Sequence, residues 1–208
     1  MPVTEVRHPL VQHKLSYLRD HMTPTVHFRK LVEEVTLLLT YEATKEFPTE
    51  LVEIETPLET TELPRISGKK VAVCPILRAG LGMLDGVLDL ISGARVGFIG
   101  LYRDEETLQP VEYYVKLPLD VADRDVILLD PMLATGNSTA HAVRLVKDAG
   151  ATSVILIAII AAPEGVERVL AEFPDVRIVV AAVDRGLNER GYIVPGLGDA
   201  GDRLYGTK

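Results

Sequence analysis

Residues 125–151 read DVILLDPMLATGNSTAHAVRLVKDAGA, and this stretch decides the fold. Its segment 126–129 is short and wholly apolar, and the acidic residue Asp130 follows it directly. After a turn of small and polar residues, apolar side chains recur every three or four positions between 138 and 149. The pattern predicts a buried β-strand, a tight turn and an amphipathic helix, in that order.

The same alternation continues on both sides of this stretch. Short apolar segments lie at residues 70–77, 94–102, 126–130, 153–162 and 177–183, and helical patterns lie at 80–91, 138–151 and 164–173. Strands that are apolar on both faces and alternate with helices predict an α/β fold with a central, mostly parallel sheet flanked by helices. In such sheets ligands bind in the loops beyond the carboxyl ends of the strands.

Other regions have patterns of their own. Helices are expected over about 10–19 and from Thr25 onward, with Thr25 or Thr23 as the cap of the second helix. The stretch 50–59 is expected to be extended and broken by a proline. Alternating residues within 96–117, on both sides of a charged segment, predict a β-arm with a mobile tip.

Composition narrows the classes of function. The chain has 208 residues, and its 22 Lys and Arg against 30 Asp and Glu give a net charge of -8, which counts against binding to nucleic acid. Its single cysteine, Cys74, excludes an internal disulfide and is expected to be a buried core residue in a reducing compartment. The N-terminus lacks an apolar signal segment, and the apolar run 153–163 is too short to span a bilayer. These observations predict a cytoplasmic protein without membrane contact.

The turn after Asp130 has the chemistry of a sugar-phosphate site. A helix N-terminus presents unpaired N–H groups to a phosphate, and we expect Gly136 to let the backbone approach closely. The hydroxyls of Thr135, Ser138 and Thr139 add donors, while the carboxylate of Asp130 accepts hydrogen bonds from vicinal hydroxyls or holds a metal. The alternative is a capped helix after a strand, with Asp130 bonded within its own loop. The Walker pattern of nucleotide triphosphatases is absent.

Near the C-terminus, residues 196–201 read GLGDAG and match the dinucleotide-binding pattern G-x-G-x-x-G. That pattern needs a strand before it and a helix after it within a βαβ unit. We expect no helix to follow this segment, so a dinucleotide site is not predicted. The histidines lack metal-ligand spacing, and His141 is expected on the surface of its helix.

Several segments resemble one family. The stretch 126–139 resembles the binding motif of the type I phosphoribosyltransferases, in which an apolar strand runs into acidic residues, a small turn and T-G-x-[ST]. Many members carry two adjacent acids, whereas Pro131 follows Asp130 here, as in the uracil phosphoribosyltransferases. Four other segments resemble that same family in the same order: HPLVQHKLSYLRD (8–20), FRKLVEEVTLLLTYEAT (28–44), VCPILRAGLGMLDG (73–86) and YIVPGLGDAGDRLYGT (192–207).

The resemblance implies roles for particular residues. Asp130 would hold the ribose of 5-phospho-α-D-ribose 1-diphosphate (PRPP), and the turn after it would anchor the 5′-phosphate. Arg78 would hold the diphosphate, and Arg103 would reach it when the arm tip closes. The implied catalytic residues are Asp130, Arg78, Arg103 and Asp199. The implied PRPP-binding residues are Arg78, Arg103, Asp130, Pro131, Met132, Leu133, Ala134, Thr135, Gly136, Asn137, Ser138 and Asp199.

The resemblance also implies that the C-terminal segment forms a hood over the base. Backbone groups at Ile193, Gly198 and Ala200 would read uracil, and Asp199 would lie on the side of the diphosphate and its metal. Uracil matches the donors and acceptors of a peptide backbone, whereas the extra carboxylate of orotate needs a cation. The segment 191–201 contains no Lys or Arg, which favours uracil.

The implied reaction converts uracil and PRPP to UMP and diphosphate in pyrimidine salvage. Mg²⁺ would bind mainly through PRPP, without a protein cage. The resemblance further implies a homo-oligomer, either dimer or tetramer, and a GTP effector whose site the sequence does not indicate. We expect a single domain over 1–208, made of N-terminal helices and an extended segment (1–69), the α/β core with the arm (70–183) and the hood (184–208).

Two alternatives stay open. Some proteins with this fold regulate transcription or attenuate messages by binding RNA or DNA, although the net charge of -8 and the absence of a basic stripe count against this function. Within enzymes, the alternative is a phosphoribosyltransferase for another base.

Overall fold

The computed structural model describes residues 2–68, 71–103 and 110–207, with the backbone alone for Arg103 and Pro110. The strands of its central sheet are β1 (Val3–Glu5), β4 (Val71–Leu77), β5 (Arg95–Val96), β6 (Phe98–Arg103), β7 (Pro110–Lys116), β8 (Asp125–Leu129), β9 (Met132–Leu133), β10 (Ser153–Ala161) and β11 (Arg177–Val183). Their main order is β1–β11–β10–β8–β4–β6–β7, while β5 pairs with β4 and β9 with β10. All pairs are parallel except β6 with β7, so the predicted mostly parallel sheet is confirmed.

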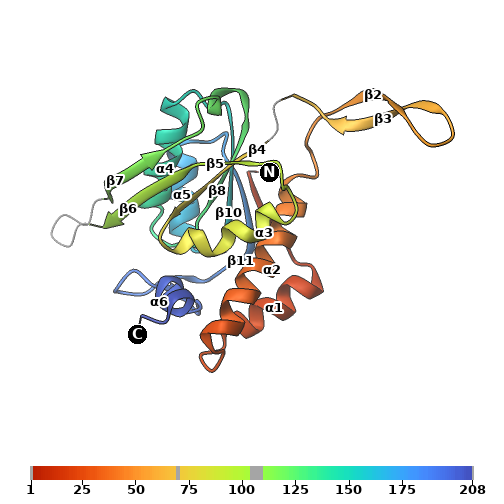
Figure 1. The fold of residues 1–208 in the computed structure, drawn as a ribbon. Coiled ribbons are helices and arrows are strands. Elements are labelled where there is room, and N and C mark those ends of the chain that lie inside the picture. Colours follow the sequence, from red (N-terminus) through yellow and green to blue (C-terminus); the bar gives the residue numbers. More distant parts are fainter. Residues whose placement is uncertain (1, 69–70, 104–109, 208) are drawn as a thin grey trace.

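Helices cover both faces of this sheet (Figure 1). They are α1 (Pro9–Arg19), α2 (Thr25–Ala43), the 3₁₀ helix η1 (Ala79–Met83), α3 (Leu84–Leu88), the 3₁₀ helix η2 (Val121–Asp123), α4 (Asn137–Asp148), α5 (Pro163–Glu172) and α6 (Ala200–Tyr205). The helices α1, α2 and α3 pack on one face, and α4 and α5 pack on the other. Among the described residues, no helix combines the length and the apolar character that crossing a bilayer requires.

The strand β8 shows why the apolar segments form the centre. Ile127 and Leu129 face the core with α1 and α2, whereas Val126 and Leu128 face the core with α4. All four side chains are fully buried. Successive side chains of a strand point to opposite faces, so a strand covered by helices on both sides must be apolar at every position.

Two small hairpins complete the fold. The strands β2 (Thr49–Glu55) and β3 (Thr60–Ile66) form a two-stranded sheet of their own, which extends away from the body in Figure 1. The predicted extended stretch is therefore confirmed, but the second strand of this hairpin was not predicted. Near the C-terminus, β12 (Gly186–Leu187) pairs with β13 (Ile193–Val194) in an antiparallel ladder.

The predicted helices agree with the structure except in two details. The N-cap of α2 is Pro24 and not a threonine; the hydroxyl of Thr23 donates instead to the carbonyl oxygen of Tyr17 at 2.6 Å. The helix predicted over 80–91 is split into η1 and α3, because its glycines favour helix poorly and pack closely against neighbouring elements.

The two strands of the predicted β-arm are confirmed. β6 and β7 pair antiparallel from Phe98 with Lys116 to Arg103 with Pro110. Its tip, 104–109, lies outside the described residues. The division of the single domain at 69 and 183 stays a prediction.

Candidate active site

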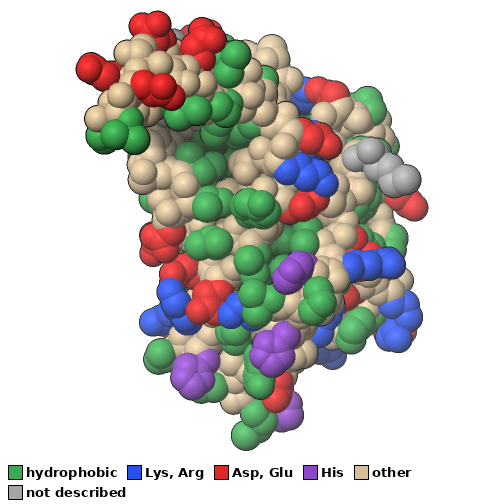
Figure 2. Space-filling view, turned by 90° about the vertical axis from the view of Figure 1, so that its right-hand side faces the viewer, with side chains coloured by type: hydrophobic (Ala, Val, Ile, Leu, Met, Phe, Trp, Pro, Cys, Tyr) green, Lys and Arg blue, Asp and Glu red, His purple; other side chains and the backbone are tan. Residues whose placement is uncertain are grey.

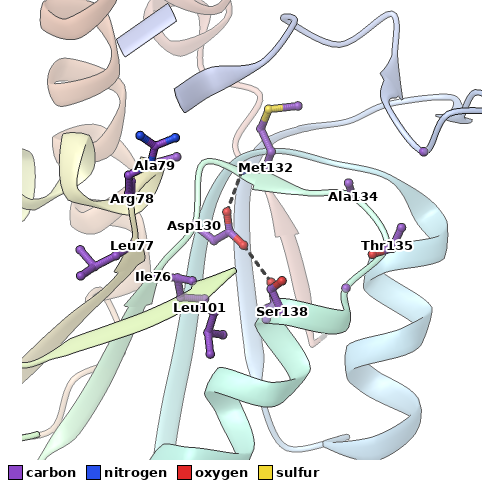
Figure 3. A pocket seen from close by; sticks show the side chains of 13 residues that line it. Ile76, Leu77, Arg78, Ala79, Leu101, Asp130, Met132, Ala134, Thr135 and Ser138 are labelled. Carbon is purple, nitrogen blue, oxygen red and sulfur yellow. Dashed lines mark hydrogen bonds between the residues drawn. The ribbon is translucent and has the colours of Figure 1, made fainter. Parts of the chain in front are cut away.

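A cavity lies at the carboxyl ends of β4 and β8, where an α/β sheet is expected to bind its ligand. Its volume is about 280 Å³, and Figure 3 shows side chains from β4, β6 and the turn after β8 around it. The residues that line it are Ile76, Leu77, Arg78, Ala79, Leu101, Asp130, Met132, Ala134, Thr135, Gly136, Ser138, Thr139 and Gly191. The structure thus brings these predicted PRPP-binding residues together: Arg78, Asp130, Met132, Ala134, Thr135, Gly136 and Ser138.

Asp130 presents its carboxylate to this cavity in a fixed orientation. Its Oδ1 accepts a hydrogen bond from the backbone N–H of Met132 at 3.3 Å, and its Oδ2 accepts one from the hydroxyl of Thr139 at 3.0 Å (Figure 3). Desolvation by the surrounding protein raises the pKa of Asp130 from 3.8 to about 6, although both hydrogen bonds oppose the rise. The group is therefore mostly ionised at neutral pH and able to accept hydrogen bonds from a sugar.

The turn after Asp130 ends at the N-terminus of α4. Gly136 occupies the N-cap position with a left-handed φ of 78°, and no side chain among the described residues caps the helix. Thr135 and Ser138 line the cavity beside this N-terminus, an arrangement that suits a phosphate. Thr139 does not act as predicted, because it is buried and its hydroxyl donates to Asp130. It orients the carboxylate instead of offering a donor to a phosphate.

Gly136 also has a packing reason for being glycine, besides the predicted approach to a phosphate, which stays a prediction. A Cβ atom at this position would lie 2.7 Å from the carbonyl oxygen of Gly165 in α5. In turn, a Cβ atom on Gly165 would lie 2.4 Å from the carbonyl oxygen of Ala134. The close approach is therefore between the turn and α5, and it sets the position of the turn against the second helical layer.

The remaining predicted residues of this turn contribute backbone and core contacts. The carbonyl oxygen of Pro131 accepts hydrogen bonds from the N–H groups of Ile159 and Ile160 at 3.1 and 3.2 Å. Leu133 is fully buried in β9, and Asn137 is the first residue of α4. These residues tie the turn to β10, so their predicted part in PRPP binding stays a prediction.

Arg78 follows β4 directly and lines the same cavity as Asp130, as predicted. The peptide bond between Leu77 and Arg78 is cis, and the carbonyl oxygen of Arg78 accepts a hydrogen bond from the hydroxyl of Tyr205 at 2.9 Å. A Cβ atom on Gly80 would lie 2.3 Å from the carbonyl oxygen of Leu129. This glycine lets the Arg78 loop lie directly against the strand that ends at Asp130.

The C-terminal segment differs from the prediction in one element. The short helix α6 begins at Ala200, within GLGDAG, although no helix was expected there. Asp199 caps it by accepting a hydrogen bond from the N–H of Asp202 at 2.9 Å. The strand before it, β13, has two residues in an antiparallel pair with β12, so the βαβ context of a dinucleotide site is still not met.

The predicted base-reading residues Ile193, Gly198, Asp199 and Ala200 are not among the described residues that line the cavity of Asp130. Gly191 lines the first cavity, and a Cβ atom on it would lie 4.0 Å from Cγ2 of Thr135. Gly198 and Asp199 line a second cavity of about 490 Å³, whose other residues are His21, Met22, Thr23, Pro24, Thr25, Asp202 and Arg203. The side chains of Ile193 and Ala200 are buried, which leaves their backbone groups for recognition.

Arg103 is the last residue of β6 and pairs with Pro110 through the backbone. Its side chain lies outside the described part of the structure. Its contact with a diphosphate therefore stays a prediction.

Other polar groups of the core suggest no further chemistry. Among the described residues, no group of three or more His, Cys, Asp or Glu side chains is placed to hold a metal ion. Cys74 is buried as predicted, and burial raises the pKa of its thiol to about 12. His141 is less exposed than predicted, with Nε2 shielded from solvent and 3.9 Å from Oε2 of Glu112 on the arm.

Sequence reasoning missed several residues around the cavity. Ile76, Leu77 and Leu101 line it because β4 lies between β8 and β6, and strand order cannot be read from hydrophobic pattern. Asp184, which follows the apolar strand β11 directly, was also missed. An acidic residue at the end of a buried strand was the signal that identified Asp130, and it applied equally to Asp184.

Comparisons with known proteins agree with this geometry. The chain matches the family model described as uracil phosphoribosyltransferase over residues 5–207. A uracil phosphoribosyltransferase from Clostridium perfringens is 60% identical over 206 residues, which cover 99% of each chain. A solved structure of a protein from Aquifex aeolicus is 40% identical and superposes with a TM-score of 0.94 over 99% of each chain.

A more distant structure shows the fold alone. A hypoxanthine-guanine phosphoribosyltransferase from Bacillus anthracis superposes with a TM-score of 0.50 at 10% identity, over 76% of this chain and 79% of the other. Its likeness places the sheet and its helices among the type I phosphoribosyltransferases. Together with the match along nearly the whole sequence, it leads to one conclusion: this chain belongs to the uracil phosphoribosyltransferase family.

Proposed function

We infer that this protein is a pentosyltransferase that transfers the phosphoribosyl group of PRPP to uracil, forming UMP and diphosphate in pyrimidine salvage. One observation carries this inference. Asp130, Arg78 and the N-terminus of α4 surround a single cavity, in a chain that matches the family over residues 5–207. A carboxylate, a guanidinium and a helix N-terminus are the groups that the ribose, the diphosphate and the 5′-phosphate of PRPP require.

Each part of PRPP has a place in this arrangement. The 5′-phosphate binds at the turn of Thr135, Gly136 and Ser138, which lines the cavity where α4 begins. The ribose hydroxyls donate to Asp130, whose carboxylate is held by Met132 and Thr139. The diphosphate then extends toward the loop that begins at Arg78.

The reaction exchanges one bond at C1 of the ribose for another. The bond from C1 to the diphosphate oxygen breaks as N1 of uracil forms the new bond to C1, and the proton of N1 leaves with the departing diphosphate. The sugar acquires oxocarbenium character, while negative charge grows on the departing diphosphate. Arg78 and Arg103 stabilise that negative charge, and the ionised Asp130 keeps the ribose in place, so catalysis depends on positioning and electrostatics.

The hood selects the base through its backbone. Uracil is read by the peptide groups at Ile193, Gly198 and Ala200, and Asp199 lies toward the diphosphate. A Cβ atom on Gly201 would lie 4.0 Å from Cβ of Ala79, which brings the start of α6 close to the Arg78 loop. The segment 191–201 offers no cation to a carboxylate on the base, and this supports uracil over orotate.

Mg²⁺ is the proposed metal, and the donors around the cavity fit it. Asp130 is the carboxylate that lines the cavity in the described structure, and Mg²⁺ needs few protein oxygens because it keeps several waters and binds substrate phosphates. When bound, the ion neutralises charge on the diphosphate. Asp130, with Asp199 at the hood, would be the protein groups nearest to it.

The hairpin of β2 and β3 supports the proposal of a homo-oligomer. A two-stranded hairpin alone is marginally stable in water, yet this one carries four exposed apolar residues: Leu51, Leu58, Leu63 and Ile66. It is also acidic, through Glu50, Glu53, Glu55, Glu59 and Glu62. Figure 2 views the molecule from the side on which the hairpin extends, and it shows acidic side chains gathered at the upper end with hydrophobic side chains below them. A second copy of the chain covering these apolar residues would explain them.

Two further proposals come from the family resemblance alone. They are GTP as an effector, without an assigned site, and a location in the cytoplasm. The oligomer is tested by sedimentation, and a monomer at micromolar concentration would contradict it. A GTP effector is tested by its effect on turnover, and no change at saturating GTP would exclude it.

Product analysis with PRPP and uracil, cytosine, orotate or hypoxanthine tests the function. We expect UMP from uracil alone; turnover of hypoxanthine without turnover of uracil would contradict the proposal.

A parallel titration with fluorescent RNA tests the nucleic-acid alternative, for which tight binding unaffected by uracil would be the evidence. Arg103→Ala is expected to lower kcat more than it weakens uracil binding, and an unchanged kcat would remove Arg103 from catalysis.

A further inference from the structure

An ion pair joins the end of α1 to the end of β11. Nη2 of Arg19 lies 2.5 Å from Oδ1 of Asp184, and Nη1 of Arg19 lies 2.8 Å from Oδ2. The side chain of Asp184 is only 4% exposed, and that of Arg19 is 23% exposed. Removing two charges from water in this way is costly. In some proteins such a pair is retained because it fixes one conformation and not because it adds stability.

Both partners of this pair also bind the same residue of the hood, Gly196. The N–H of Gly196 donates to Oδ2 of Asp184 at 2.9 Å, and Nη1 of Arg19 donates to the carbonyl oxygen of Gly196 at 2.8 Å. The donor and the acceptor of one residue are therefore satisfied by one ion pair. Gly196 has a φ of 68°, and a Cβ atom on it would lie 2.1 Å from the carbonyl oxygen of Ile193, so no other residue type fits this bend.

A second guanidinium holds the next residue. Nη1 of Arg203 donates to the carbonyl oxygen of Leu197 at 2.8 Å, and Nη2 donates to that of Asp20 at 2.6 Å. Arg203 also donates to Leu18 and lies over the ring of Phe28, 4.2 Å from its centroid. The hood is thus tied to the C-terminal end of α1 at two consecutive residues.

These contacts leave Gly198 between two fixed points. On one side, Gly196 and Leu197 are held by the two arginines; on the other, Asp199 caps α6. Gly198 has a φ of 81° and is exposed. The backbone of Gly198 is among the groups proposed to read uracil. Its orientation is set by its fixed neighbours, Leu197 and Asp199.

We propose that Arg19 and Asp184 are positioning residues for base recognition, which act through Gly196 to place the backbone groups that read uracil. The proposal rests on the proposed function of the hood. Neither side chain lines the cavity that holds Asp130 and Arg78, so the pair is expected to affect the base and to leave PRPP binding unchanged. Arg19 must be an arginine because one Nη atom serves Asp184 and Gly196 together, whereas lysine offers a single point charge.

Conservative variants test this directly. Asp184→Asn keeps the shape of the side chain and an acceptor for Gly196 but loses the charge. Arg19→Lys keeps the charge but loses the planar guanidinium, whose N–H groups bind Asp184 and Gly196 together. Each is expected to raise the KM for uracil about tenfold or more, with the KM for PRPP unchanged. The matched control is Asp120→Asn, which breaks a two-point pair with Arg124 at the opposite end of the sheet and is expected to change neither KM.

An apolar double variant separates positioning from stability. Replacing both members of a buried ion pair with apolar residues often restores or improves stability, whereas removing one partner leaves an uncompensated charge. Arg19→Met combined with Asp184→Leu is therefore expected to unfold at a higher temperature than either single replacement, Arg19→Met or Asp184→Leu, because no uncompensated charge is left buried. Its KM for uracil stays raised, because the N–H and the carbonyl of Gly196 have lost their partners. Hydrogen exchange in residues 192–200 is expected to be faster in this variant and in Asp184→Asn.

The outcomes distinguish this inference from the proposed function. Wild-type protein that forms no UMP would refute the uracil activity, and this inference with it. An active wild type whose Asp184→Asn and Arg19→Lys variants keep a normal KM for uracil would refute the inference alone. So would a double variant that recovers the wild-type KM, or variants in which the KM for PRPP rises equally.

Discussion

The turn that follows β8 and the hood at the C-terminus are proposed to bind the two substrates of one reaction, but they are built differently. In the turn, the hydrogen bond between Asp130 and Thr139 joins residues nine positions apart. In the hood, Arg19 and Asp184 are 165 positions apart, and Arg203 and Leu18 are 185 apart. The turn is local in sequence, and the hood is held by residues from the other end of the chain.

This difference separates two kinds of recognition. The turn is proposed to bind phosphate and ribose with groups that one strand, one turn and one helix bring together. The hood is proposed to bind a flat base with peptide groups, and peptide groups in an irregular segment need side chains as hydrogen-bond partners to fix them. We therefore expect changes near the turn to act on PRPP, and changes in the hood to act on uracil.

The largest effect is expected at Asp130. Asp130→Asn removes the charge that is proposed to hold the ribose, and kcat/KM for PRPP should fall about a hundredfold or more. The fold should remain intact, because an amide still accepts the hydrogen bond of Thr139. Steady-state kinetics with circular dichroism as the folding control checks this. A rate within about twofold of wild type would show that this carboxylate lies outside the reaction.

A matched pair of glycine variants tests the separation itself. Gly165→Ala places a Cβ atom 2.4 Å from the carbonyl oxygen of Ala134 and pushes on the turn. Gly196→Ala places one 2.1 Å from the carbonyl oxygen of Ile193 and pushes on the hood. The first should raise the KM for PRPP about tenfold, and the second should raise the KM for uracil by as much.

The control for this pair is Gly93→Ala, because nothing lies within 4 Å of its added Cβ atom. Its free energy of unfolding should change by less than about 0.5 kcal/mol, against a loss of about 1–3 kcal/mol for each of the other two. Urea unfolding measures all three. If both clashing variants raised both KM values to the same extent, the turn and the hood would not be separate units.

The pKa of Asp130 predicts a pH dependence confined to the turn. Desolvation raises this pKa to about 6, so kcat/KM for PRPP should fall as the pH is lowered through 6, by about tenfold per further unit. The same step should be missing from Asp130→Asn, which controls for the titration of PRPP. An identical step in both proteins would assign it to the substrate.

The sign of the stability effect follows from the same shift. The pKa of Asp130 is higher in the folded protein, about 6, than its ordinary value of 3.8, so the folded state binds the proton more readily. Its contribution to stability is therefore present below about pH 4 and is lost as the pH rises through about 6. Compared with Asp130→Asn, wild type should lose stability across this window, as urea unfolding at several pH values would measure.

The smallest effect is expected at Arg29, which holds α6 by one hydrogen bond. Its Nε donates to the carbonyl oxygen of Leu204 at 2.5 Å. Arg29→Met should raise the KM for uracil about threefold and cost about 1 kcal/mol of stability. The neighbouring Lys30→Met removes an exposed ion pair with Glu33 and should change neither value. Equal effects of both variants would show that α6 does not need this hydrogen bond.

Much of the sheet could be predicted from the sequence because its signals are short-range. Strands such as 126–129 are apolar at every position, and α4 shows the spacing of a helix with one buried face. The position of Asp130 at the end of its strand follows from the same pattern. The helix α6 escaped prediction because its six residues are too few for a period, and its stability comes from Arg29 and Arg203.

The roles of individual glycines and hydroxyls could not be predicted. Gly136 matches a phosphate-binding pattern, but the atom closest to its missing Cβ belongs to Gly165. Thr139 matches a phosphate donor, but its hydroxyl faces Asp130. In both cases the residue type follows from the local motif, and the partner follows from packing between separate elements.

The sequence alone was sufficient for the strand, turn and helix around Asp130 and for the family. Burial of both faces of a strand leaves a local pattern, and so does a helix that follows a tight turn. Only the folded structure shows the ion pair between Arg19 and Asp184 and the hydrogen bonds of both side chains to Gly196. These residues meet because α1 packs beside β11 at the end of the sheet, and no local pattern encodes a contact between residues 165 positions apart.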